Sequence, residues 1–179
     1  MKGKINWKAE LIDLSKTMLF SLITVFLITT FIAKPVKVNG DSMYPQVKDE
    51  QIGFSFVLGK NHVERFDIVV VYIEEDNKYL VKRVIGLPNE TISYKDSQLM
   101  VNGDVIDEDF LDEKYVASQS LTSNFTNNLE ITLKEGEYFL LGDNRPYSKD
   151  SRSYGAFSQE DIVSKGLIVL YPFNEFGVK

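Results

Sequence analysis

The sequence predicts a mainly β protein, in which one N-terminal transmembrane helix precedes an antiparallel β-sheet domain. Three observations support this fold class. An uncharged run of 17 residues lies near the N-terminus, at 17–33. Short segments rich in Val, Ile and Tyr, separated by turn residues, follow along much of the chain, which is typical of strands. After residue 34 no helical periodicity of comparable strength occurs.

The uncharged run, "TMLFSLITVFLITTFIA", has nearly the length that a bilayer requires. As a helix it would span about 26 Å, against a hydrocarbon core of about 30 Å. Lys16 and Lys34 flank the run and can extend to the interface. The alternatives are a buried core helix, which would normally show a polar stripe, and a signal peptide, which would end in a small-x-small cleavage site. The run shows neither pattern, so we expect a retained anchor at 17–33.

The lysines on either side of the run predict its orientation. They are in slight excess on the N-terminal side, where Lys2, Lys4, Lys8 and Lys16 precede the run, while Lys34, Lys37 and Lys48 follow it. Because cytoplasmic flanks carry the excess of basic residues, we expect the segment 1–16 in the cytoplasm and residues 34–179 outside the cell membrane. The outer part contains 16 basic and 24 acidic residues and so has a net charge of −8.

Composition argues against several classes of function. The chain of 179 residues has a net charge of −6, whereas nucleic-acid binding requires a basic face. The absence of cysteine excludes disulfides, thiolate metal sites and a cysteine nucleophile. His62 is the single histidine, so the usual zinc sites lack their ligands. We therefore expect no metal, no cofactor and no nucleic-acid partner.

Two hairpin regions follow the anchor. Residues 65–74 and 78–87 are rich in Val, Ile and Tyr, and the intervening "EDN" makes a hairpin turn plausible. Residues 90–106 contain two further turn signals, at Asp96-Ser97 and at Asn102-Gly103.

The C-terminal half has fewer strand signals. Residues 129–143 predict another hairpin, which would turn at Glu135-Gly136, and residues 165–173 predict a final buried strand. A single helical turn is expected at 158–163. Between 106 and 130 the chain is polar and acidic, which predicts a surface excursion.

The stretch "NGDSMYPQ", residues 39–46, contains a candidate nucleophile. Ser42 could belong to an ordinary turn; as a nucleophile it needs a base to take its proton. His62 lies in a polar, turn-like stretch, where a histidine is more often solvated than catalytic. A lysine can replace it only when neutral, and burial favours the neutral form because it disfavours the charge.

The strand-like stretch "YLVKRVIG" supplies a candidate base. Because side chains alternate along a strand, Lys82 shares its face with Leu80 and Val84, while Arg83 lies on the other face. Arginine stays protonated and cannot accept the proton. On this stretch alone, the alternative of an edge strand with both cations in water stays open.

A third stretch, "LGDNRPYSKDSRSYG" at 141–155, concentrates polar side chains after a predicted strand. Alone it predicts a solvated loop. Together with the serine and lysine stretches, it resembles the bacterial type I signal peptidases, membrane-bound serine proteases with a Ser–Lys dyad. The family pattern "G-D-N-R-x-x-S-x-D-S-R" is matched at every fixed position from Gly142 to Arg152.

Two further family patterns occur in the family's order. Residues 40–45 are similar to "G-x-S-M-x-P", and "YLVKRVIGLPNE" is similar to "Y-x-K-R-V-x-G-x-P-G-D" with one residue more between Tyr79 and Lys82. A weaker fourth pattern, usually "R-G-D-I-V", is matched by residues 65–69. The resemblance covers the chain from the anchor to the last predicted strand.

The resemblance implies a role for each residue of the site. Ser42 would be the nucleophile and Lys82 the general base. Ser148 would hydrogen-bond and orient the Lys82 amine, and Asp150 with Arg152 would form an ion pair beside the site. The Ser42 backbone N–H would donate to the oxyanion.

The family also implies a substrate and a binding mode. Its members cut signal peptides from secreted preproteins at the membrane surface, after small-x-small residues, so the partners would be such preproteins and the lipid bilayer. The peptide would add as a strand beside residues 36–40 and 79–81. Small pockets for its side chains would have these walls: Val38, Met43, Leu80 and Val81.

Some positions depart from the family pattern. Gly40 lacks the hydroxyl that some members use as a second oxyanion donor, and Gln46, Phe66 and Asn89-Glu90 replace the usual residues. None of these is a dyad residue. The alternative function is that of an inactive relative acting as a membrane-anchored binding protein, against which the retained dyad counts.

The resemblance also divides the outer domain. The catalytic core would comprise about 34–90 and 138–179, and a β-rich insertion or cap would comprise about 91–137.

Overall fold

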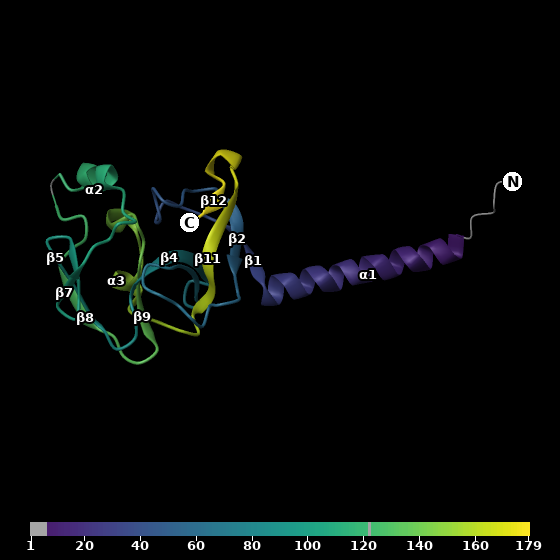
Figure 1. The fold of residues 1–179 in the computed structure, drawn as a ribbon, viewed down its shortest axis with the longest axis horizontal. Coiled ribbons are helices and arrows are strands. Elements are labelled where there is room, and N and C mark those ends of the chain that lie inside the picture. The colour runs from purple at the N-terminus through teal and green to yellow at the C-terminus, as the bar shows by residue number, and fades with distance from the viewer. Residues whose placement is uncertain (1–6, 122) are drawn as a thin grey trace.

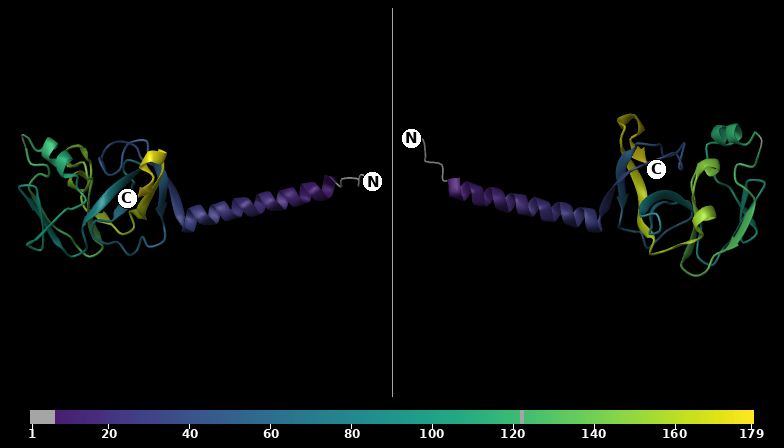
Figure 2. Two further views of the ribbon diagram at one scale, coloured as in Figure 1. Left: turned by 45° about the horizontal axis from the view of Figure 1, so that its top comes forward. Right: turned by 180° about the vertical axis from the view of Figure 1, so that it is seen from behind.

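One long helix projects from a domain of two antiparallel sheets in the computed structural model, which describes residues 7–121 and 123–179 (Figure 1). The helix, α1 (Trp7–Phe31), has no buried residue, and it stands clear of the sheets in two further views (Figure 2). Among the described residues it is the single helix long and apolar enough to cross a membrane.

The helix differs from the predicted run 17–33 at both ends. It begins ten residues earlier, because the charged segment before the run is helical as well, with Lys16 paired to Asp13 one turn away at 3.3 Å. It ends two residues earlier, because Ala33 already belongs to a strand and pairs with Phe56.

The larger sheet has the order β1-β2-β11-β3-β4-β9-β10, with β12 beside β11, and its paired strands are antiparallel. Its strands are β1 (Ala33–Lys37), β2 (Ile52–Phe56), β3 (Ile68–Ile73), β4 (Lys78–Gly86), β9 (Glu137–Leu141), β10 (Phe157–Ser158), β11 (Ile162–Tyr171) and β12 (Gly177–Val178). A second sheet has the order β7-β6-β5-β8. Its strands are β5 (Thr91–Lys95), β6 (Gln98–Val101), β7 (Asp104–Ile106) and β8 (Leu129–Thr132). This architecture confirms the predicted fold class.

The turn residues of the smaller sheet act as the sequence predicts. Asp96 and Ser97 both have positive φ and connect β5 to β6 in a two-residue turn. Asn102 and Gly103 also have positive φ and connect β6 to β7. Positive φ at both central residues matches the right-handed twist of the flanking strands, which is why such turns favour asparagine, aspartate and glycine.

The predicted hairpin at 129–143 is wrong. Strand β8 pairs with β5 in the smaller sheet, and β9 pairs with β4 in the larger one. Between them Leu133 is buried, and its N–H donates to the Glu90 carbonyl at 2.8 Å. The turn residues predicted that the chain would reverse, but they carry no information about which strand lies beside each arm. The chain uses this turn to pass from one sheet to the other.

The predicted helical turn at 158–163 is also wrong. The Asp161 carboxylate does accept from the N–H and hydroxyl of Ser158, at 2.7 and 2.9 Å. These bonds close a tight turn between β10 and β11 rather than starting a helix, because β11 begins at once with the buried Ile162.

The polar excursion contains a short helix that the sequence analysis did not predict. This helix, α2 (Glu113–Gln119), is capped by Asp112, whose side chain accepts from the Tyr115 N–H at 2.7 Å. Further short helices are η1 (Arg145–Tyr147), α3 (Ser151–Tyr154) and η2 (Phe173–Glu175).

Strand β4 links separate parts of the core. Val84 belongs to one apolar cluster within the larger sheet, whereas Ile85 belongs to a second cluster shared with the smaller sheet. A third cluster lies under the loop after β1 and includes Val38, Met43 and Val47. Val81 of β4 packs against this third cluster, so the loop that contains the candidate nucleophile is fastened to the strand that contains the candidate base.

Candidate active site

Ser42 lies in the loop between β1 and β2, which local bonds and apolar packing hold in place. The Gly40 N–H donates to the Asp49 carboxylate at 2.6 Å, and the Tyr44 N–H donates to the Asp41 carbonyl at 3.1 Å. Met43, the next residue, is buried in the third apolar cluster. Ser42 itself stays partly exposed, so its hydroxyl can be reached from outside.

The Lys82 amine reaches this hydroxyl from β4. Its Nζ donates to the Ser42 Oγ at 2.7 Å and to the Val81 carbonyl at 2.9 Å. Only 1% of Lys82 is exposed, and it forms no ion pair with any described residue. The alternative of an edge strand with a solvated lysine is therefore wrong, since β4 lies between β3 and β9.

Burial changes the acidity of the Lys82 ammonium. Desolvation lowers its pKa from the usual value of 10.5 to about 8, although the negative charges of Asp150 and Asp143 raise it in part. At this pKa a substantial fraction of the amine is neutral near physiological pH. A neutral amine at 2.7 Å from a hydroxyl can accept its proton.

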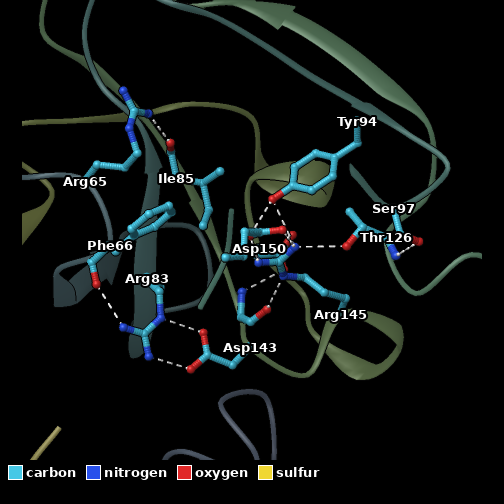
Figure 3. A network of polar contacts seen from close by, with 12 residues as sticks. Arg65, Phe66, Arg83, Ile85, Tyr94, Ser97, Thr126, Asp143, Arg145 and Asp150 are labelled. Atoms are coloured by element: carbon cyan, nitrogen blue, oxygen red, sulfur yellow. Dashed lines mark hydrogen bonds and ion pairs between the residues drawn. The ribbon is translucent and has the colours of Figure 1, made fainter. Parts of the chain in front are cut away.

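Arg83, on the opposite face of β4, has the contrary environment. It is 7% exposed, and its guanidinium makes a bidentate pair with the Asp143 carboxylate, at 2.8 and 2.7 Å. A third bond goes to the Phe66 carbonyl at 2.8 Å (Figure 3). Its central carbon also lies 4.2 Å from the centre of the Phe110 ring. These contacts hold the charged form in place, so Arg83 anchors the strand.

The segment after β9 supports the nucleophile loop through Asn144. The Asn144 N–H donates to the Ser42 carbonyl at 3.1 Å, and its side-chain amide donates to the Asp41 carbonyl at 2.9 Å. The Tyr115 hydroxyl, from α2, donates to the Asn144 Oδ1 at 2.9 Å. The sequence analysis assigned Asn144 no such role. The signal was present, because Asn144 lies in the polar stretch that contains Ser148 and Asp150.

Arg145 ties the same segment to the smaller sheet. Its buried guanidinium pairs with Glu108 and donates to the Tyr94 hydroxyl at 3.0 Å and to Thr126 at 2.9 Å (Figure 3). Its Nε also donates to the Gly142 carbonyl at 3.0 Å. The sequence analysis did not anticipate this cluster, since the partners come from segments up to 51 positions away.

Asp150 and Arg152 form a bidentate ion pair, with both contacts at 2.8 Å. Burial raises the pKa of the Asp150 carboxyl, but the hydrogen bond and charge of Arg152, together with the Gly142 N–H, lower it, so that the pKa lies below its ordinary value. Asp150 also accepts from the Gly142 N–H at 3.1 Å. The pair therefore keeps the Asp150 carboxylate ionised near Lys82, with the opposite charge of Arg152 beside it.

The expected hydrogen bond between Ser148 and Lys82 is not formed in this structure. The Ser148 Oγ is buried and has no hydrogen-bond partner among the described residues, because the Lys82 amine is directed at Ser42 and the Val81 carbonyl. Ser148 nevertheless packs against the site. A Cβ added at Gly142 would lie 2.2 Å from the Ser148 Oγ and 2.3 Å from the Ser42 carbonyl oxygen. Only glycine fits between these two serines.

A cleft of about 540 Å³ opens beside Ser42. Its lining includes Ser42 and every pocket residue named from the sequence: Val38, Met43, Leu80 and Val81. The walls are β1, which is the edge strand of the sheet, and the first half of β4, whose pairing with β9 begins only at Arg83. The cleft thus lies between two strand segments, each with an unpaired edge.

His62 has no hydrogen bond to Ser42 or Lys82 among the described residues. It is exposed, and its carbonyl accepts from the Lys165 amine at 2.9 Å. The described residues contain no group of three or more His, Cys, Asp or Glu side chains that could hold a metal ion.

Comparison with known proteins places this geometry in a family. The family model described as "Signal peptidase, peptidase S26" matches residues 11–171. Signal peptidase I P of Bacillus subtilis subsp. natto is 38% identical over 171 residues, which cover 93% of this chain and 92% of that protein. Signal peptidase IB of Staphylococcus aureus is 33% identical over 180 residues, which cover 94% of each chain.

A solved structure agrees with these relatives. The crystal structure of a signal peptidase I from Enterococcus faecalis V583 is 36% identical, with a TM-score of 0.50, over 57% of this chain and 94% of that one. Since the family model and the relatives both span nearly the whole sequence, this chain belongs to the signal peptidase family, peptidase S26.

Proposed function

We propose that this protein is a type I signal peptidase, a serine endopeptidase that removes signal peptides from secreted preproteins. In this proposal Ser42 is the nucleophile and Lys82 the general base. The observation that carries it is the contact of 2.7 Å between the Lys82 amine and the Ser42 hydroxyl, made by a lysine that is 1% exposed. The family membership of the chain supports the same activity.

The lowered pKa of Lys82 means that a useful fraction of its amine is neutral at physiological pH. With a pKa of about 8, about one Lys82 amine in ten is neutral at pH 7, against roughly one in 2,500 for an ordinary lysine with a pKa near 10.4. The neutral amine takes the proton of Ser42, and the Oγ bonds to the carbonyl carbon of the scissile peptide.

The rest of the reaction follows from the same two groups. The tetrahedral intermediate collapses as its C–N bond breaks, and the Lys82 ammonium returns a proton to the leaving amine. Lys82, neutral again, then takes a proton from a water molecule that attacks the acyl ester. The second collapse breaks the C–Oγ bond and releases the acid product, and the Lys82 ammonium returns its proton to the Ser42 Oγ, which restores the hydroxyl.

The oxyanion of each intermediate needs hydrogen-bond donors. The Ser42 backbone N–H has no partner among the described residues and is the first donor. Gly40, with φ of +89°, has no side chain to supply a hydroxyl. Loss of one such donor in a serine protease lowers the rate by about 10²–10³, so a second donor from elsewhere would matter for the rate.

The cleft suits an extended peptide. A substrate strand can add to the free edge of β1 and to the first half of β4 through backbone hydrogen bonds. Its alternate side chains would then point into the cleft and contact the walls. Val38, Leu80 and Val81 leave room for small side chains. This fits a preprotein with small residues at the first and third positions before the scissile bond.

The position of the cleft suits a membrane-bound substrate. Its lining includes Thr29 near the end of α1 and Lys34 just after it. We therefore assign α1 as a membrane anchor with the cleft at the bilayer surface. The lysine bias around the helix supports an N-terminus in the cytoplasm and a domain outside.

The division of the domain is part of the proposal. Ser42, Lys82 and most of the cleft lining lie within 34–90, while Val163 and Ser164 of the lining and the supporting residues from 142 to 152 lie within 138–179. The intervening residues, 91–137, contain the smaller sheet and α2. We assign the first two segments as the catalytic core and the third as an insertion.

The decisive experiment incubates the detergent-solubilised full chain with a preprotein and sequences the new N-terminus. Cleavage after a small-x-small sequence is expected, with Ser42→Ala inactive. Ser153→Ala, a change to an exposed serine outside the cleft, should retain full activity. Binding of the preprotein without cleavage would instead identify an inactive relative that acts as a binding protein.

Orientation is tested separately. Protease added to intact protoplasts should digest the domain, because the proposal places it outside. Protection in intact cells, with digestion only after lysis, would show that the orientation is reversed.

A further inference from the structure

A second cavity, also of about 540 Å³, adjoins the nucleophile and shares no lining residue with the cleft. Its walls are Asp41, Tyr44, Tyr115, Asn144 and Tyr147. Asp41 directly precedes Ser42, and Asn144 hydrogen-bonds to the carbonyls of both. The second cavity therefore lies beside the loop that holds the reacting serine. The catalytic proposal so far uses only the cleft.

The direction of the substrate distinguishes the two hollows. The cleft begins near the end of α1, since Thr29 and Lys34 line it. The second cavity is bounded by Tyr115 of α2, which lies at the end of the domain remote from α1 (Figure 1). A preprotein whose signal peptide enters from the membrane passes the cleft, then Ser42, and then the second cavity. The residues after the scissile bond would therefore leave through this cavity.

The chemistry of the walls suits this part of the chain. Three tyrosine rings offer flat surfaces for backbone and side chains of any sequence, and the exposed Asp41 adds a negative charge. When the scissile C–N bond breaks, the leaving amine receives a proton from the Lys82 ammonium. It then becomes a free α-amino group, which is largely protonated at neutral pH. A carboxylate and aromatic faces both attract such a cation.

The cavity is built from braced groups and from one strongly exposed group. The Tyr44 and Tyr115 rings meet edge to face with centroids 5.0 Å apart, and the Tyr115 hydroxyl donates to Asn144 at 2.9 Å. Tyr147, by contrast, is 71% exposed and is available to cover a bound chain.

We propose that this cavity binds the first residues of the mature protein, with Asp41 facing the new N-terminus and Tyr147 covering the following residues. The inference rests on the proposed function, because it assigns the remaining part of the same substrate. It also gives α2 a role: Tyr115 brings the polar excursion into contact with the substrate.

The test uses peptides that share one sequence before the scissile bond and differ after it. Acidic residues at the first two positions after the bond should lower kcat/KM about fivefold relative to neutral residues, because they face the carboxylate of Asp41. Asp41→Asn should reduce that difference to less than about twofold. Asp104→Asn, which removes an exposed carboxylate in the smaller sheet, should leave it unchanged.

A second variant keeps the test valid if Asp41→Asn disturbs the nucleophile loop. Tyr147→Ala should raise KM about threefold for peptides with three or more residues after the scissile bond, since it removes an aromatic contact. It should leave a peptide with one such residue unaffected. Tyr171→Ala, at an exposed tyrosine outside both hollows, is the matched control.

The outcomes separate this inference from the function on which it rests. Cleavage whose rate ignores the residues after the scissile bond, in wild type and in both variants, would overturn the inference alone. Failure of the wild type to cleave any of the peptides would overturn both.

Discussion

The two faces of β4 bury neighbouring cations in opposite ways. On one face Lys82 is buried and has no ion pair with any residue that the structure describes, and its pKa falls to about 8. On the other face Arg83 is buried against Asp143 in a bidentate pair. Both side chains leave water, but only one finds a counterion at hydrogen-bond distance.

The difference explains how one strand can hold both the proposed base and an anchor. An unpaired buried amine relieves the cost of desolvation by losing its proton, which makes it a base. A paired guanidinium keeps its proton and rigidifies the surrounding structure. Asp150 and Asp143 lie close enough to raise the pKa of Lys82 but do not bond to it. The separation between these two carboxylates and the Lys82 amine therefore helps to set the pKa of Lys82.

Lys82→Arg tests the comparison most strongly. It places a guanidinium, like that of Arg83, on the face of β4 where the described residues offer no ion-pair partner. We expect kcat/KM to fall by about 10³ or more, as it should for Lys82→Ala, since a guanidinium cannot accept the proton of Ser42. Cleavage assays on purified protein measure this loss. Substantial activity in Lys82→Arg would mean that Lys82 only positions the substrate and that the base lies elsewhere.

Arg83→Met tests the other face. It leaves the buried Asp143 without a partner, so the free energy of unfolding should fall by about 3–5 kcal/mol, measured by urea denaturation in detergent. Arg83→Met combined with Asp143→Leu should recover part of that loss, because no charge remains buried. Lys134→Met removes an exposed pair with Glu137 and should leave the unfolding free energy unchanged within error. If Arg83→Met and Lys134→Met lowered the unfolding free energy equally, the buried pair would not anchor β4 as described.

Ser148→Ala tests whether the residues around the amine position it. The variant should lower kcat about tenfold without abolishing activity, since the hydroxyl is buried against the site but does not replace the base. Ser153→Ala is the matched control, because Ser153 is exposed on α3. A loss as large as that of Lys82→Ala would require Ser148 to take part in proton transfer itself.

The pH dependence of kcat/KM tests how the neighbouring charges set the base. Activity should rise through a limb near pH 8, because Lys82 must be neutral. Asp150 raises the pKa of Lys82 and Arg152 lowers it, so Asp150→Asn should move the limb to lower pH and Arg152→Met to higher pH. Shifts in the same direction for both variants would contradict this electrostatic account.

The same shift in pKa affects stability. Since the folded pKa of about 8 lies below the unfolded value of 10.5, the unfolded state binds more protons between these values. The free energy of unfolding should therefore rise with pH across that window, and Lys82→Met should flatten the rise. Unfolding curves at several pH values provide the measurement.

His62→Ala gives the smallest expected effect. His62 is exposed and its carbonyl contacts Lys165, not the dyad. We expect kcat/KM to stay within a few-fold of wild type. A loss of about 10³, the scale of a missing general base, would favour a Ser–His mechanism instead.

Local patterns predicted several features because their physical causes are local. The uncharged run predicted a helix, and turn-forming residue types predicted the turns at Asp96-Ser97 and Asn102-Gly103, where the structure has positive φ. The alternation of side chains placed Lys82 and Arg83 on opposite faces of one strand. Each of these depends only on residues a few positions apart.

Pairings between distant segments were less predictable. The arms of the supposed hairpin at 129–143 joined different sheets, and the pair of Ser158 with Asp161 closed a turn instead of starting a helix. The supports given by Asn144 and Arg145 also stayed unassigned, although both lie in a recognised motif. A turn signal or a polar side chain does not specify its partner, because several partners satisfy the same local rule.

The sequence by itself therefore determined which groups were available: a serine after an apolar helix, a lysine on an alternating strand, and a polar segment late in the chain. Only the tertiary structure decided that Lys82 lies 2.7 Å from Ser42, 40 positions away. It also decided that Lys82 is buried without a counterion while Arg83 meets Asp143. The reason is physical: desolvation and charge pairing depend on which distant strands cover a side chain, and those strands come together only on folding.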